Sequence, residues 1–183
     1  MIKFINPSAE KPYIHFQSLY EEALANNQKG IEAISVSSYN QHMNEVEARY
    51  VNLKYIADNE WIFFSNYNSP KAQQFRSHSQ VSVLIFWPSI NIQIRIKAKI
   101  SKTSADFSDE HFLGRTQEKN ALAISSDQSS VISSYDLVTE KYKYAKFKNL
   151  SYFIIHHQFP YFVKFLLVDL LVDLITDFSF SLS

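Results

Sequence analysis

Apolar and polar residues alternate through much of the first 100 positions of the chain, in the way that is typical of β-strands. The clearest alternation covers residues 92–100, where apolar side chains at even-numbered positions are separated by polar ones. Such a strand has one face in a core and the other in solvent. Further strands are predicted at 31–37, 46–56, 61–66 and 81–87, with turn-forming residues between them.

Helical spacing of apolar residues precedes these strands and occurs in short pieces between them. Residues 14–26 form an amphipathic pattern that ends near Asn27. Shorter helices are predicted at 68–78 and 108–113, the second with Ser108 as its N-cap. Many short strands with few long helices predict a mainly β protein, a small barrel of antiparallel strands with peripheral helices.

The composition changes after about Lys148, where Phe, Leu, Val, Ile and Asp become dominant. Three aspartates follow one another at every fourth position: Asp169, Asp173 and Asp177. This spacing predicts one charged face of a C-terminal helix, which is either a solvated surface or, alternatively, a carboxylate metal site. The first alternative is preferred, so no metal ligand is predicted. Lys164 and the aspartates interrupt residues 159–178 too often for a membrane span.

Length and composition indicate one domain and exclude several function classes. The chain has 183 residues, of which 46% are hydrophobic, enough for one core. We divide it into an N-terminal helical segment (1–30), a barrel core (31–137) and a divergent C-terminal segment (138–183). Lys plus Arg and Asp plus Glu both total 18. Because no net field attracts polyanions, neither nucleic acid nor a membrane is an expected partner.

The numbers of cysteines and glycines exclude further kinds of functional site. The chain has no cysteine, which excludes disulfides and thiolate chemistry, and only two glycines, which excludes glycine-rich phosphate loops. The first ten residues lack the apolar stretch of a secretory signal, so a cytoplasmic location is expected.

Four stretches carry side chains that suit an anionic or heterocyclic ligand. Residues 49–54 form a strand with Arg49 at one end and Lys54 at the other. Both side chains bind phosphate, but strict alternation places them on opposite faces unless a bulge intervenes. Taken alone, this stretch is better explained by two surface cations on an edge strand.

The other three stretches are weaker individually. Residues 61–71 lead from an aromatic strand through a polar turn into a helix, an arrangement that suits a phosphate. Gln93 lies on the polar face of the strand at 92–100, where its amide could bind a heterocycle. The last stretch combines residues 108–115 with 125–130.

In this order and spacing, the four stretches resemble the pyridoxamine 5'-phosphate oxidase family over roughly residues 16–137. The matching motifs are Arg49-Tyr50-Val51-Asn52-Leu53-Lys54, Phe64-Ser65-Asn66 with Ser69-Pro70-Lys71, Trp87 with Ile92-Gln93-Ile94-Arg95, His111-Phe112-Leu113-Gly114-Arg115-Thr116, and Gln128-Ser129. The joint pattern carries the resemblance, because each motif alone is common.

The resemblance implies an FMN-binding split barrel that forms a homodimer with FMN between the two subunits. The residues that it assigns to FMN are Arg49, Tyr50, Val51, Asn52, Leu53, Phe64, Ser65, Lys71, Gln93, Gln128 and Ser129, with Arg49 and Lys71 at the phosphate and Gln93 near the flavin ring. The residues that it assigns to the substrate phosphate are Lys54, His111, Arg115 and Lys119. No catalytic side chain is assigned.

The chain departs from the family pattern at several of these places. Pro70 stands where the family commonly has an arginine, while His111 and Lys119 replace a tyrosine and a serine. The family's C-terminal Trp-Gly-Gly, Glu-Phe-Trp and Arg-x-His motifs are absent after Leu150. A frameshifted or replaced terminus and a folded helix particular to this lineage would each explain that tail.

The expected function is therefore an FMN-dependent oxidoreductase that acts on pyridoxamine or pyridoxine 5'-phosphate, by hydride transfer from C4' to flavin N5 and then to oxygen. Two alternatives remain open. The chain could bind FMN but act on another small molecule or be catalytically inactive, or it could be a barrel dimer that has lost its cofactor.

Overall fold

The computed structural model describes residues 1–65, 69–125, 134–147 and 162–174, and its chain divides into two compact units. The first unit comprises Met1–Phe64, Gln74–Ser101 and the segment that begins at Val163. The second comprises Ser65–Gln73 and Lys102–Phe162. Apart from the end residues Lys102 and Phe162, the strands belong to the first unit, and three of the helices belong to the second.

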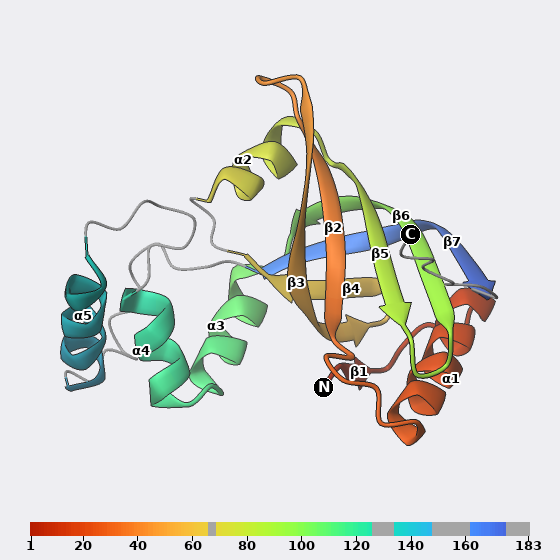
Figure 1. The fold of residues 1–183 in the computed structure, drawn as a ribbon, viewed down its shortest axis with the longest axis horizontal. Coiled ribbons are helices and arrows are strands. Elements are labelled where there is room, and N and C mark those ends of the chain that lie inside the picture. The colour runs from red at the N-terminus through yellow and green to blue at the C-terminus, as the bar shows by residue number, and fades with distance from the viewer. Residues whose placement is uncertain (66–68, 126–133, 148–161, 175–183) are drawn as a thin grey trace, which may run out of the picture. The chain divides into compact units, whose positions relative to one another are not determined.

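The first unit is built on one curled, seven-stranded sheet (Figure 1). Its strands are β1 (Lys3–Ile5), β2 (Ala33–Asn40), β3 (Glu45–Ala57), β4 (Glu60–Phe64), β5 (Gln80–Trp87), β6 (Ile92–Lys102) and β7 (Phe162–Leu174). Their order is β1-β3-β2-β5-β6-β7-β4, and an additional β3–β4 pairing closes the circuit into a barrel. The predicted barrel is confirmed. The pairings β2–β3, β2–β5, β3–β4 and β5–β6 are antiparallel, whereas the unpredicted β1 runs parallel to β3.

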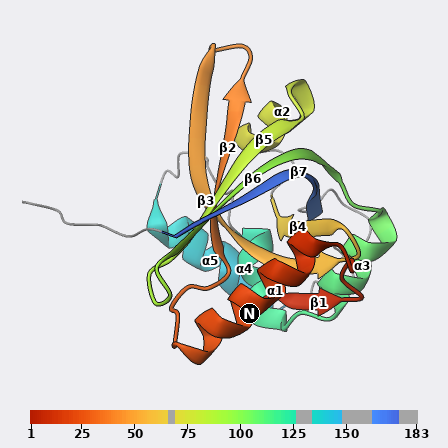
Figure 2. The ribbon, with the colours of Figure 1, turned by 90° about the vertical axis from the view of Figure 1, so that its right-hand side faces the viewer.

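Alternating side chains fill the barrel, as the sequence pattern predicts. On β5 and β6 every second residue is buried, including Val83, Ile85, Ile94 and Ile96. Helix α1 (Lys11–Ala25) covers one end of the barrel with its apolar face (Figure 2). Phe16 on this helix is fully buried, and its ring centroid lies 4.4 Å from that of Trp61 and 5.4 Å from that of Trp87.

The predicted helices of the first half of the chain are found close to the expected positions. Helix α1 ends at Ala25, and Asn27 adopts a left-handed conformation (φ 57°) beside the cap. This is the helix stop that the asparagine predicted, since Asn tolerates this region better than most residues. Helix α2 (Pro70–Ser77) lies within the predicted range 68–78.

The second unit contains helices α3 (Ala105–Leu113), α4 (Gln117–Ser125) and α5 (Tyr135–Phe147). The predicted N-cap of α3 is wrong. The helix begins before Ser108, and Ser104 caps it by accepting a 3.3 Å hydrogen bond from the backbone N–H of Phe107. Ser108 lies inside the helix and donates its hydroxyl to the carbonyl of Ser104 at 3.1 Å.

The predicted C-terminal helix is wrong within the described residues, because 162–174 form strand β7 between β6 and β4. The four-residue spacing of Asp169 and Asp173 does not distinguish the two structures, since an even spacing also places residues on one face of a strand. Asp177 lies outside the described residues. None of the described helices is long and apolar enough to cross a membrane.

Candidate functional site

Arg49 occupies a partly buried position on the inner face of β3. It pairs across the sheet with the buried Val36 of β2, and paired residues share a face. Its side chain is 18% exposed, whereas a surface cation on an edge strand would extend into solvent. Burial lowers the pKa of Arg49 below its usual value, and the neighbouring Glu47 carboxylate offsets part of this shift.

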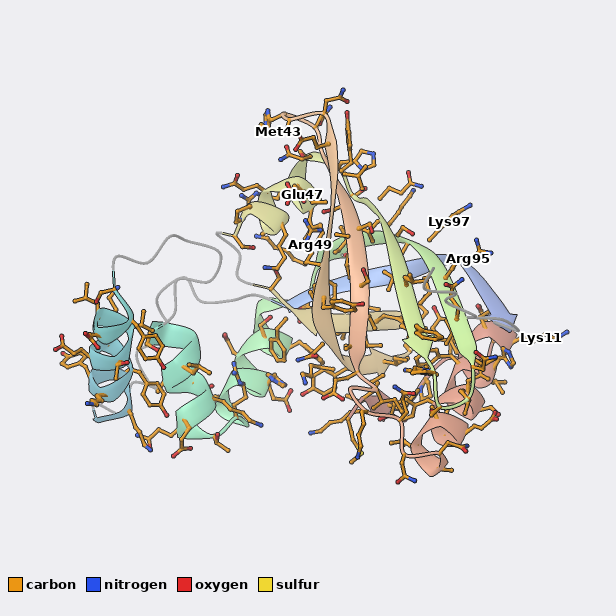
Figure 3. The ribbon with its side chains drawn as sticks, in the orientation of Figure 1. Lys11, Met43, Glu47, Arg49, Arg95 and Lys97 are labelled. Carbon is orange, nitrogen blue, oxygen red and sulfur yellow. The ribbon has the colours of Figure 1, made fainter. Side chains whose placement is uncertain are left out.

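The Arg49 guanidinium is held by a network of polar groups from β2, β3 and α2. Nη1 donates to the carbonyl of Val36 at 3.2 Å and to Oγ of Ser38 at 2.6 Å. Nη2 donates to Oε1 of Gln74 at 2.8 Å and to Oε2 of Glu47 at 3.4 Å. Figure 3 shows Glu47 and Arg49 next to each other on β3. The guanidinium is therefore fixed in one orientation before any ligand binds.

The four residues after Arg49 differ in what they could offer to a ligand. Tyr50 is 80% exposed and Asn52 is exposed, so both side chains lie on the outer face of the sheet. Val51 is partly buried against the core and Leu53 is fully buried within it. Only the backbone of Leu53 could therefore contact a cofactor.

Lys54 stands at an irregularity in the β3–β4 register, which occurs between Leu53 and Tyr55. The bulge that the sequence analysis named as the alternative to strict alternation is therefore present at this position, and the alternation from Arg49 does not assign Lys54 to a face. The Lys54 Nζ is 3.8 Å from Oε1 of Glu32. Burial alone would raise the pKa of Glu32, but its own backbone N–H, the amino group of Met1 and Lys54 together lower the pKa.

Gln93 lies on the outer face of β6, opposite Phe86 of β5. Next to this pair, the registers place four residues in one row across the sheet: Tyr50, Ser35, Leu84 and Arg95. Leu84 and Phe86 are 41% and 42% exposed, which is high for apolar side chains in the middle of a sheet. We call Tyr50, Leu84, Phe86 and Gln93 the outer patch. Arg95 and Lys97 also point away from the barrel (Figure 3).

The remaining residues assigned to FMN have different positions. Phe64 is the last residue of β4 and is partly buried. Ser65 is buried, and Lys71 is partly buried in the first turn of α2, three residues before Gln74. Ser65 and Lys71 belong to the second unit. Gln128 and Ser129 lie outside the described residues.

Three of the four residues assigned to the substrate phosphate belong to the second unit, and Lys54 belongs to the first. His111 is partly buried in the last turn of α3. Arg115 follows that helix and donates from Nη2 to the backbone carbonyl of Lys119 at 3.1 Å. Burial lowers the pKa of Arg115. The structure thus brings Arg115 to the α4 segment that carries Lys119, whose side chain is exposed.

The partners of Arg49 are the part of the site that the sequence analysis missed. Ser38, Glu47 and Gln74 do not belong to the motifs quoted above, and two of them lie on other elements. The one available signal is that Glu47 and Arg49 are two residues apart on a strand and therefore share a face. Among the described residues, no group of three or more His, Cys, Asp or Glu could hold a metal ion.

Comparisons with known proteins show which family this chain belongs to. The family model described as "Pyridoxamine 5'-phosphate oxidase" matches residues 21–149. The pyridoxine/pyridoxamine 5'-phosphate oxidase of Rhodopirellula baltica is 33% identical over 130 residues, which are 70% of this chain and 58% of that protein. The enzyme of the same name from Leptospira interrogans is 29% identical over 145 residues, 79% of this chain and 66% of that protein. The chain therefore spans less than two thirds of the length of these relatives.

Solved structures share the fold at low sequence identity. PhzG from Burkholderia lata, in complex with tetrahydrophenazine-1-carboxylic acid, superposes with a TM-score of 0.82 at 15% identity, covering 91% of this chain and 81% of that one. A pyridoxamine 5'-phosphate oxidase-related, FMN binding protein from Nostoc punctiforme superposes with a TM-score of 0.66 at 8% identity, covering 86% and 83%. The barrel is thus that of the FMN-binding split-barrel proteins. Because the family model matches well over half of its length, the chain belongs to the pyridoxamine 5'-phosphate oxidase family.

Proposed function

We propose that the protein binds FMN and acts as an FMN-dependent oxidoreductase. The observation that carries this proposal is the fixed, partly buried guanidinium of Arg49. By its motif, Arg49 resembles the arginine that the family uses for the FMN phosphate. An arginine that is pre-oriented by its neighbours loses little side-chain entropy when it binds a phosphate. The family match over residues 21–149 supports the same assignment.

The residues present fit an anionic cofactor. Arg49 and Lys71 would hold the FMN phosphate together with Ser65, and Gln93 would donate and accept hydrogen bonds at the flavin ring. Tyr50, Asn52 and the backbone of residues 51–53 would contact the rest of the cofactor, with Phe64, Gln128 and Ser129 completing its site. The chemistry that FMN supplies when bound is acceptance of a hydride at N5 and re-oxidation by oxygen. The protein's part is to orient the reactants and neutralise their phosphates.

We also propose that the protein acts as a homodimer with FMN between the subunits, and that it is cytoplasmic. Arg49 lies on the inner face of the sheet, whereas Gln93 lies on the outer face. Two contacts on opposite faces are easier to reconcile when they come from different subunits. The exposed apolar members of the outer patch support this arrangement, since homodimer interfaces are enriched in such residues.

For the substrate, we propose pyridoxamine or pyridoxine 5'-phosphate, oxidised at C4'. Lys54 and Arg115 would bind its phosphate, and His111 and Lys119 would add hydrogen bonds or charge. A correctly held phosphate would fix the distance from C4' to the flavin, on which the rate of hydride transfer depends strongly.

The cofactor is tested by an absorbance scan of freshly purified protein across the flavin bands, followed by identification of the released compound. FMN at about one per chain is expected. A protein that stays colourless after incubation with excess FMN would contradict the proposal and favour a barrel that has lost its cofactor.

A second candidate function is oxidation or reduction of a different small molecule. It is favoured by His111 and Lys119, which replace the tyrosine and serine of the family pattern and so change the hydrogen-bonding groups of the substrate site. PhzG, which shares the fold, binds a compound with a carboxylate rather than a phosphate.

The two candidates are separated by mixing the flavin-loaded protein anaerobically with excess pyridoxamine 5'-phosphate. Bleaching of the flavin supports the oxidase. If the flavin is not bleached, reduction by a nicotinamide donor would favour a reductase, and no reduction by any donor would favour a flavin-binding protein without activity.

A further inference from the structure

The carboxylate of Glu47 is bound by three donors in the way that an external anion would be. It lies 3.4 Å from Nη2 of Arg49, accepts from Nε2 of Gln74 at 2.6 Å, and accepts from Nδ2 of Asn40 at 3.3 Å. A guanidinium and two amide N–H groups form a donor set that also suits phosphate oxygens. The structure therefore contains an anion site that is filled by the carboxylate of Glu47, from the same strand as Arg49.

A ligand phosphate meets an Arg49 guanidinium whose terminal hydrogens are already in use. The two terminal nitrogens carry four hydrogens, and four acceptors among the described residues use them: Val36, Ser38, Gln74 and Glu47. A phosphate can therefore take a terminal hydrogen only by displacing one of these acceptors.

Glu47 is the acceptor that is easiest to displace. Ser38 and Gln74 are each 3% exposed, and Val36 contributes a backbone carbonyl of a paired strand. The Glu47 side chain is 44% exposed, and its contact with Arg49 is the longest of the four. Water solvates a released carboxylate well, so Glu47 can swing into solvent, and an incoming phosphate oxygen can then accept from Nε2 of the buried Gln74 in its place.

We propose that Glu47 is an internal competitor of the ligand phosphate, and that it determines how tightly the protein binds a phosphate monoester at Arg49. The proposal rests on the proposed function, since the ligand is the FMN phosphate. When FMN binds, the carboxylate must leave Arg49, and it still repels the phosphate dianion from nearby. A flavin without the phosphate does not compete with Glu47.

The test compares Glu47→Gln with the unchanged protein, using FMN and riboflavin as two ligands that differ in the phosphate. Glutamine keeps the size of the side chain and removes its charge. FMN is expected to bind about tenfold more tightly to the variant, which is the typical effect of removing one close like charge. Riboflavin is expected to bind both proteins equally. Dissociation constants are measured by quenching of flavin fluorescence.

Glu45→Gln is the matched control, because Glu45 is an exposed glutamate two residues earlier on the same strand. It changes the net charge equally, so a general charge effect would strengthen FMN binding in both variants and would overturn the proposal. Equal FMN affinity of Glu47→Gln and the unchanged protein would overturn it as well, while leaving the flavin site intact. Absence of flavin binding in every protein would overturn the proposed function together with this inference.

A second experiment uses inorganic phosphate in place of flavin and alanine in place of glutamine at position 47. Glu47→Ala empties the donor set, and millimolar inorganic phosphate is expected to raise the midpoint of thermal unfolding more for this variant than for the unchanged protein or Glu45→Gln. A phosphate response that is equal in all three proteins would contradict the proposal even if one variant is less stable than the others.

Discussion

The hydroxyl of Ser38 donates a 2.6 Å hydrogen bond to Oε1 of Gln74, and this bond joins strand β2 to helix α2 at a point where both residues are 3% exposed. The same oxygen accepts from Arg49 at 2.8 Å, and the amide nitrogen of Gln74 donates to Glu47 at 2.6 Å. One amide side chain therefore satisfies a hydroxyl, a guanidinium and a carboxylate. The orientation of Arg49 depends on this residue.

Replacing Gln74 with alanine is expected to lower the free energy of unfolding by about 1–3 kcal/mol, because Ser38 and Arg49 lose a partner in a buried setting. Urea unfolding monitored by tryptophan fluorescence measures the change. The matched control is Gln73→Ala, since Gln73 is the exposed preceding residue of the same helix. An equal loss in both variants would mean that the helix, not the amide network, is responsible.

Replacing Phe16 with alanine is expected to destabilise the protein by about 3–5 kcal/mol, the usual cost of removing a fully buried aromatic ring. The ring contacts both Trp61 and Trp87, so its loss leaves a cavity between α1 and the barrel. Ile14→Ala on the exposed side of the same helix should change the stability by less than about 0.5 kcal/mol. Urea unfolding of both variants checks the prediction, and similar losses would contradict it.

The sequence predicted the barrel because its strands carry a strong signal of period two. The alternation on β6 agrees with burial of Ile94, Ile96 and Ala98, whereas on β3 it is interrupted by the irregularity between Leu53 and Tyr55. The helix predicted for the C-terminal segment was wrong because residues 162–174 form a nearly continuous apolar run. In such a run, periodicity does not distinguish a buried strand from a helix.

The sequence could indicate a candidate site residue only where a single local motif identifies it. Arg49 follows from a local pattern, but its environment is made by contacts across the fold, from Ser38 on β2 to Gln74 on α2. A hydrogen bond between residues that are 36 positions apart leaves no local signal in the sequence. The competing carboxylate of Glu47 could be suspected from its spacing to Arg49, but its hydrogen bond to Gln74 could not.

Glu32 makes part of the stability depend on pH. Its pKa is lowered below the ordinary value of 4.5 in the folded protein, so folding favours the ionised carboxylate. The stabilisation is therefore present above the unfolded pKa and is lost as the pH falls through the lower, folded pKa. Glu32→Gln should thus be less stable than the unchanged protein at about pH 7, by roughly 0.5–1 kcal/mol, and should approach it at about pH 3.

Urea unfolding of both proteins at the two pH values measures this difference. Glu22→Gln, an exposed glutamate on α1, is the control for the loss of one charge. A stability gap between Glu32→Gln and the unchanged protein that persists at low pH would show that Glu32 acts through packing and not through Lys54 and the amino group of Met1.

Arg115 offers a way to separate the proposed substrate site from the proposed cofactor site. Arg115→Met is expected to raise the KM for pyridoxamine 5'-phosphate about ten- to a hundredfold, which corresponds to one charged hydrogen bond, and to leave the FMN dissociation constant unchanged. Arg115→Lys should give an intermediate KM, because lysine keeps the charge but lacks the planar fork. Lys97→Met, an exposed cation on β6, is the control and should match the unchanged protein.

The guanidinium of Arg115 also donates to the backbone carbonyl of Lys119. If Arg115 had only this structural role, its replacement would weaken FMN binding and substrate binding together. That outcome would remove Arg115 from the substrate site.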